Sequence, residues 1–174
     1  MATIKIFING IILLLTSIIG YAYGNIYTRR ARNLLDLQYC IRVLESEIIN
    51  GNVPLPQALE NTSVKGRGSI SILFKEIKDD LTINKREDVF HSFLRQKYNL
   101  EDRYAFKTED IEVFLYLGKI LGKSSRRDQE KNMQFIISQL DNLYIEAQNE
   151  EAKNAKLYRT LGFLAGLVIV IILI

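Results

Sequence analysis

The segment Gly118–Ser124 comes nearest, among the short motifs of this chain, to a pattern that binds phosphate. It reads G-x-x-x-G-K-S, one residue short of the phosphate-binding loop, which has four residues between its glycines. That loop also follows a strand, so that its amides surround the phosphates ahead of a helix N-terminus, whereas the apolar spacing before Gly118 is helical. We therefore predict no nucleotide site. Gly118 is interpreted as a close contact between helices and Gly122 as the stop of a helix.

The chain has one cysteine, Cys40, and one histidine, His91. A single cysteine cannot form an intramolecular disulfide, and the two residues together cannot make a zinc site of the common Cys/His kinds. They lie in distant segments, so a catalytic Cys–His pair is not favoured. We predict that Cys40 is packed on a helix and that His91 lies at the surface or boundary of a helical bundle. No catalytic residue, metal ligand or cofactor site is predicted.

The acidic pair Glu45 and Glu47 does not suit acid/base chemistry either. Two residues apart on a helix, the side chains diverge by about 200°, so they cannot act on one proton or one metal ion unaided. The net charge of the chain is +3, and its basic residues are spread out without interleaved aromatics. Nucleic-acid binding therefore has little support, and the composition favours assembly over catalysis.

The hydropathy of the chain is an average over two kinds of sequence. Of its 174 residues 48% are apolar and 25% charged, with a mean hydropathy of +0.02. From Ile6 to Tyr23 there is no charge, and as a helix this stretch would be roughly 27 Å long, close to the bilayer's apolar core of about 30 Å. The apolar tail would be only about 21 Å long, a marginal span or a half-insertion. We predict a transmembrane anchor over 1–26, a bundle domain over 27–160 and a membrane segment over 161–174.

Basic residues flank the middle domain at both junctions. They are Arg29, Arg30, Arg32, Lys153, Lys156 and Arg159. The positive-inside rule then predicts a cytoplasmic middle domain with both termini on the other side of the membrane. A cleaved signal peptide is the alternative at the N-terminus, because Ala22-Tyr23-Gly24 has small residues at the spacing that a signal peptidase accepts. The basic residues that follow at once favour the uncleaved anchor.

Each apolar end also carries two glycines four residues apart, Gly20 and Gly24 in the first and Gly162 and Gly166 in the second. This spacing puts both glycines of a pair on one face of a helix, where another helix can approach closely. We predict these four glycines as candidate positions for helix packing in the membrane.

The middle domain shows helical spacing almost throughout and no sustained alternation of period two, so we predict an all-α fold. The expected bundle has about six helices. They cover about 27–50, a short segment near Pro56, 70–81, 89–98, 108–122 and a last helix from Ser125. No proline or glycine interrupts the last helix before Gly162, so we expect it to be continuous with the apolar tail.

Two segments resemble the stage III sporulation protein AB family. They are Leu44–Ala58, which reads LESEIINGNVPLPQA, and Leu161–Leu167, which reads LGFLAGL; the similarity extends over nearly the whole chain. The resemblance implies a component of the secretion-like complex between mother cell and forespore. It further implies a non-enzymatic platform or adaptor, similar to those of type II secretion and type IV pilus systems, whose bundle docks a secretion-type ATPase. The bundle would then face the mother-cell cytoplasm at the outer forespore membrane.

On this hypothesis the candidate contacts with the partner cluster at two helix turns. They are Glu45, Glu47, Gly51, Pro54 and Leu55 at the first turn, and Gly118, Gly122 and Gln129 at the later one. Two alternatives stay open. These residues could serve only to cap and orient helices, and the chain could be a membrane-tethered sensory or regulatory module with a different partner. A homo-oligomer is also compatible with the sequence.

Overall fold

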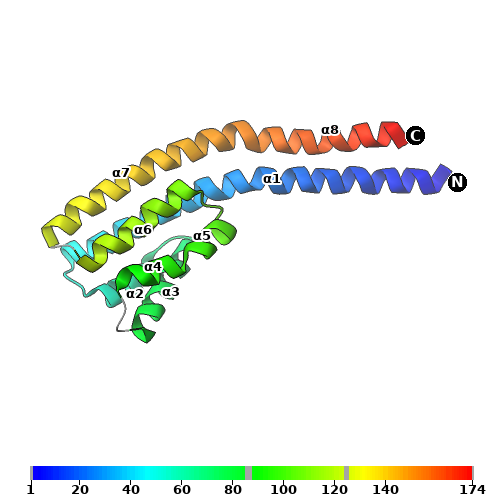
Figure 1. Ribbon diagram of the computed structural model, residues 1–174. Coiled ribbons are helices and arrows are strands. Elements are labelled where there is room, and N and C mark those ends of the chain that lie inside the picture. The colour runs from blue at the N-terminus through cyan, green and yellow to red at the C-terminus, as the bar shows by residue number, and fades with distance from the viewer. Residues whose placement is uncertain (1, 85–87, 124–125, 174) are drawn as a thin grey trace. The chain divides into compact units, whose positions relative to one another are not determined.

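A computed structural model of the chain describes residues 2–84, 88–123 and 126–173 (Figure 1), and the surroundings of the side chains in 7–84, 88–121 and 128–173. Within these ranges every regular element is a helix, which confirms the predicted all-α fold. The elements are α1 (Ala2–Glu45), the π-helical turn η1 (Ser46–Asn50), α2 (Leu55–Lys65), α3 (Ile70–Ile83), α4 (Val89–Arg95), α5 (Lys97–Tyr104), α6 (Thr108–Lys123), α7 (Arg126–Glu150), the π-helical turn η2 (Glu151–Ala155) and α8 (Lys156–Leu173).

The chain divides into two compact units. A terminal unit comprises Met1–Ala31 and Glu146–Ile174, and a central unit comprises Arg32–Ile145. The described residues α7, η2 and α8 follow one another without a gap, which confirms that the last helix is continuous with the apolar tail. The predicted N-cap of this helix, Ser125, lies outside the described residues.

The core of the central unit is built around the inner half of α1. Its fully buried apolar side chains recur at helical spacing, as predicted: Leu34, Leu37, Ile41 and Leu44. Around them α2 packs on α3 and α4 packs on α6. Between α4 and α6 the rings of Phe93 and Phe114 lie 5.0 Å apart, centroid to centroid. A Cβ at Gly118 would lie 2.7 Å from Cγ of Phe93, so the interpretation of Gly118 as a close helix contact is confirmed.

The first helix ends at the glycine that the sequence predicts, but this glycine does not adopt the left-handed conformation. Gly51 closes η1 by donating its N–H to Ser46 O (2.9 Å), yet its φ is −78°, which any residue adopts. The left-handed conformation falls one residue later, at Asn52 (φ 54°), where asparagine is one of the few tolerated side chains. Pro54 then precedes α2 as its N-cap residue.

The predicted fourth helix is two helices. It is interrupted at Gln96, whose N–H bonds to Phe93 O (3.1 Å), and α5 begins at Lys97. Tyr98, expected on the same apolar face as Phe93, is 84% exposed. No proline or glycine marks this break, which is why the spacing alone runs the two helices together.

Candidate functional site

Glu45 and Glu47, the two predicted acidic contacts, both accept hydrogen bonds inside the central unit. Glu47 in η1 accepts one from the Asn61 amide (2.6 Å) and pairs with the Lys65 ammonium (2.7 Å), both in α2. Lys65 first, and Asn61 second, lower the pKa of Glu47. Glu45 accepts a hydrogen bond from the Gln134 amide of α7 (2.6 Å). The two carboxylates therefore connect the end of the first helix to α2 and α7.

The turn after η1 brings the other first-turn candidates beside Glu47. Val53 N–H donates to Glu47 O (3.0 Å) and so folds the turn back on η1. Gly51 and Pro54 are exposed here, and Leu55 is half-buried. Gly51 and Pro54 are therefore accessible to a partner, and Leu55 is partly accessible.

The two later candidates whose surroundings the structure describes, Gly118 and Gln129, differ in burial. Gly118 is buried beneath the Phe93 ring. Gln129 is half-buried on α7. Gly122 lies in the last turn of α6, and its surroundings are outside the described residues.

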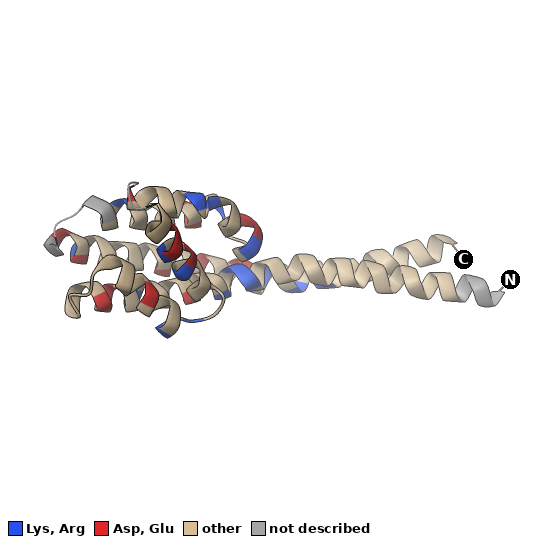
Figure 2. Ribbon diagram, turned by 90° about the horizontal axis from the view of Figure 1, so that it is seen from below, with Lys and Arg blue, Asp and Glu red and all other residues tan. Residues whose placement is uncertain are grey.

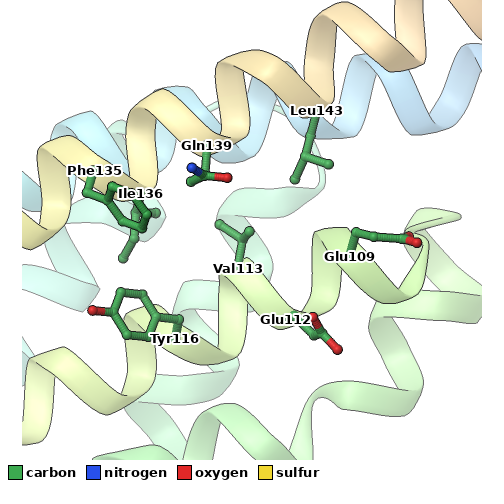
Figure 3. A pocket seen from close by; sticks show the side chains of 8 residues that line it. All are labelled: Glu109, Glu112, Val113, Tyr116, Phe135, Ile136, Gln139 and Leu143. Atoms are coloured by element: carbon green, nitrogen blue, oxygen red, sulfur yellow. The ribbon is translucent and has the colours of Figure 1, made fainter.

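The central unit has an open, largely apolar groove between α6 and α7 that the sequence motifs do not indicate (Figure 3). It has a volume of about 490 Å³. Figure 3 shows Tyr116, Phe135 and Ile136 at one end, with Val113 and Gln139 in the middle. The Tyr116 and Phe135 rings meet edge to face, 6.4 Å apart at 80°, and are 39% and 54% exposed. Two large aromatic side chains therefore share one solvent-facing hollow.

The other end of the groove is acidic. Glu109 and Glu112 line it beside Leu143, from the first two turns of α6 (Figure 3). Neither carboxylate has an ion pair or hydrogen bond within the described ranges. Other acidic side chains of the central unit are paired across helices, in the pairs Glu60–Lys78 (2.8 Å), Asp80–Arg95 (2.8 Å) and Glu76–Arg103 (3.1 Å). The groove thus combines exposed aromatics with carboxylates that no described residue neutralises.

A weak signal for this groove exists in the sequence. Glu109, Glu112 and Tyr116 lie at helical spacing on the side of α6 away from the buried Phe114. On α7, Phe135 precedes the buried Ile136 and so falls off the core stripe. An aromatic residue outside the apolar stripe on each of two neighbouring helices indicates a surface, but only once the helices are known to be neighbours.

Within the terminal unit the predicted glycines lie where α1 approaches η2 and α8. A Cβ at Gly20 would lie 2.7 Å from Gly162 Cα, and one at Gly24 would lie 2.8 Å from Ala155 O. A Cβ at Gly166 would meet the Thr16 hydroxyl. Any larger side chain at these positions would push the two backbones apart.

The same unit contains a buried arginine. Arg30 of α1, 3% exposed, contacts two carboxylates of α7, Glu150 (2.9 Å) and Glu146 (3.6 Å). Beyond this cluster, Figure 2 shows α1 and α8 side by side without acidic or basic residues over most of their described length. Both are long and apolar enough to cross a membrane, and only 11% and 6% of their most apolar stretches are buried.

The lone cysteine and histidine have no catalytic arrangement. Cys40 is buried, with its thiol 3.9 Å from Arg67 O, and burial raises the pKa of this thiol to about 11. His91 is exposed at the surface of α4. Across 2–84, 88–123 and 126–173, no three His, Cys, Asp or Glu side chains gather as a metal site.

Comparison with known proteins assigns the family. The family model of stage III sporulation protein AB matches residues 5–174. The chain belongs to this family. The stage III sporulation protein AB of Bacillus subtilis (strain 168) is 30% identical over 163 residues, which cover 93% of this chain and 94% of that protein. The family predicted from the sequence is thereby confirmed.

A solved structure of the stage III sporulation protein AB family shares the fold. The structure of stage III sporulation protein AB (SpoIIIAB) aligns with a TM-score of 0.65 at 22% identity, covering 72% of this chain and 98% of that structure. Its helical architecture therefore agrees with the elements described above. The groove between α6 and α7 and the glycine contacts of the terminal unit are thus features of a sporulation protein.

Proposed function

We propose that the chain is a non-enzymatic membrane platform, or adaptor, of a secretion-like complex between mother cell and forespore, and that its central unit docks a cytoplasmic secretion-type ATPase. The observation that carries the docking role is the α6–α7 groove, with Tyr116 and Phe135 exposed and Glu109 and Glu112 without partners in the described chain. Exposed aromatics in a hollow are typical anchors of protein interfaces. Family membership supports the sporulation context.

The terminal unit supports the membrane part of the proposal. Large apolar side chains along α1 and α8 are exposed, among them Phe7 (71%), Ile171 (68%) and Ile172 (77%). Leaving such a side chain in water instead of burying it costs about 1.5–3 kcal/mol. The pairing of α1 with α8 leaves these side chains uncovered. A bilayer covers this surface. The basic residues on the central-unit side of both apolar stretches support a cytoplasmic location for that unit.

The docking partner is expected to present a helix with apolar and basic side chains. From Glu109 to Tyr116 the groove runs along two turns of α6, about 10 Å, which matches two turns of an amphipathic helix. Its apolar side chains would contact Tyr116, Phe135 and Val113, while a lysine or arginine would lie near Glu109 and Glu112. Complementary charge at one end would fix the direction of the helix and speed its association.

The test is binding between the full-length chain, reconstituted in lipid nanodiscs, and the purified sporulation ATPase. Phe135→Asp is expected to weaken binding by at least about tenfold, since an interface anchor contributes about 2 kcal/mol or more. Ile83→Asp is the matched control, because Ile83 is 80% exposed on α3 and does not line the groove. Binding by Phe135→Asp that equals wild type, at unchanged helical content, would overturn the groove as the docking surface.

A genetic test addresses the wider role. Deletion of the gene is expected to block sporulation and leave vegetative growth intact, because the platform serves a sporulation complex. A growth or signalling defect without any sporulation defect would instead support the membrane-tethered regulatory module. Phe135→Asp in the chromosome is expected to reproduce the deletion phenotype, and Ile83→Asp to sporulate normally.

A further inference from the structure

A polar hollow lies in the terminal unit, where η2 and the start of α8 face α1. Its volume is about 560 Å³. Thr28 of α1 lines one side, and Asn149, Glu151, Lys156 and Arg159 line the other. The surface is more polar than that of the α6–α7 groove, and it supplies hydroxyl, amide and cationic groups together. This mixture suits a small ionic headgroup and does not suit an apolar side chain.

The two cations of the hollow are free to bind an anion. Lys156 and Arg159 are exposed, and no carboxylate of the described residues lies within ion-pair distance of either. Arg159 is positioned by the Tyr21 ring, whose centroid lies 4.9 Å from the guanidinium carbon. The nearby Arg30 differs, because Glu146 and Glu150 pair with it. Lys156 and Arg159 against Glu151 leave the lining with one net positive charge, which matches a single phosphodiester.

The hollow lies at the level expected for lipid headgroups, and this step rests on the proposed membrane role of α1 and α8. The stacked tyrosines mark that level: the Tyr158 ring lies between Tyr23 (6.1 Å) and Tyr27 (5.8 Å). Tyrosines gather at the boundary between hydrocarbon and headgroups. Basic pockets between helices on the cytoplasmic side of this boundary bind anionic headgroups.

We propose that this hollow binds the headgroup of an anionic phospholipid with one phosphodiester charge, of the phosphatidylglycerol type. Lys156 and Arg159 contact the phosphodiester oxygens, and Thr28 and Asn149 hydrogen-bond the headgroup hydroxyls. The acyl chains lie along the exposed apolar face of α8. Bound lipid would tie η2 to the membrane surface and hold α8 at a fixed depth.

The test uses the full-length chain in phosphatidylcholine vesicles with a small fraction of spin-labelled lipid. Spin-labelled phosphatidylglycerol is expected to associate about tenfold more strongly than spin-labelled phosphatidylcholine, as two cations near the surface suggest. Lys156→Gln and Arg159→Gln together are expected to abolish this preference. Equal association of the two lipids with wild type would overturn the proposal.

The matched control is Lys153→Gln, since Lys153 is an exposed lysine of η2 that does not line the hollow. It is expected to keep the preference that Lys156→Gln weakens. Equal losses in the two variants would show a general attraction of basic residues to the surface and overturn the site. Displacement of the labelled lipid by inorganic phosphate would show a site for free phosphate and overturn the lipid assignment.

The outcome is separable from the proposed function. Flotation of wild-type chain with pure phosphatidylcholine vesicles tests membrane anchoring without any anionic lipid. ATPase binding by Lys156→Gln with Arg159→Gln is expected to equal wild type, and the lipid preference of Phe135→Asp is expected to be unchanged. Loss of flotation would count against the membrane role, whereas loss of the lipid preference alone would count against this site.

Discussion

The turn after the first helix and the groove between α6 and α7 differ in where their polar groups find partners. At the turn, Glu47 is bonded to Asn61 and Lys65. In the groove, Glu109 and Glu112 have no partner in the described chain, and Tyr116 and Phe135 face solvent. A carboxylate that already has hydrogen bonds within the chain stabilises the fold, and a protein partner could bind it only by breaking those bonds. Binding a partner at the groove carboxylates breaks no such bonds. This difference distinguishes residues that hold the fold together from candidate contacts with a partner.

The largest expected effect compares a buried thiol with an exposed one. Ile83→Cys introduces a thiol at an 80% exposed position, whereas Cys40 is buried with a pKa of about 11. Maleimide labelling in permeabilised cells is expected to be more than about 100-fold faster at position 83, since the thiolate reacts and an exposed thiol has a pKa near 8.5.

The same pair of thiols tests sidedness. Intact cells are expected to leave position 83 unlabelled by an impermeant maleimide, because the central unit is proposed to be cytoplasmic. Labelling from outside would contradict that orientation, and prompt labelling of Cys40 would contradict its burial. Cys40 is therefore an internal reference and a poor reporter by itself.

The next effect tests whether Gly118 serves helix packing, in contrast to the exposed candidate contacts of the first turn. Gly118→Val places a Cβ against the Phe93 ring, which Gly118 contacts with no room to spare. Overpacking of this kind costs about 1–3 kcal/mol, so we expect a lower thermal midpoint by calorimetry or circular dichroism. Gly10→Val is the control, because no atom lies within 4 Å of a Cβ there. An unchanged thermal midpoint together with weaker ATPase binding would instead support Gly118 as a contact with the partner.

The helices and the buried faces could be predicted from the sequence because apolar spacing reports burial directly. Leu34, Leu37, Ile41 and Leu44 repeat at helical intervals and are all fully buried. The break at Gln96 could not be predicted in this way, since no glycine or proline marks it and the apolar spacing continues to Tyr98. Spacing therefore identifies what faces inward and gives less information on where a helix ends.

The candidate site was harder to predict because a motif does not show whether its polar groups have partners. Glu47 belongs to the segment that carries the family resemblance, yet its bonds to α2 depend on the fold. The groove needs α6 and α7 to be neighbours, which brings Tyr116 and Phe135 together across 19 positions of sequence. The glycine pairs were easier, because close approach of helices needs small residues at fixed spacing.

A smaller effect sharpens the comparison at the groove. Glu109→Lys with Glu112→Lys is expected to slow ATPase association by about tenfold at low salt, since rim charges act mainly on the association rate. The slowing should shrink as salt rises, because these carboxylates are exposed. Stopped-flow or surface-based kinetics measures it. Glu101→Lys with Asp102→Lys, exposed acidic residues of α5, is the matched control; an equal effect there would indicate general charge steering instead of a groove contact.

The smallest effect concerns the acid stability of the turn after the first helix, where Glu47 is bonded. Lys65 and Asn61 hold the pKa of Glu47 below its usual value of 4.5. The carboxylate of Glu47 therefore binds a proton less readily in the folded state than in the unfolded state. Its bonds stabilise the fold fully above the unfolded pKa, and this stabilisation is lost as the pH falls through the lower pKa of the folded state. Glu47→Gln should reduce the acid dependence of the thermal midpoint. An acid dependence in Glu47→Gln that equals wild type would show that these bonds do not stabilise the turn.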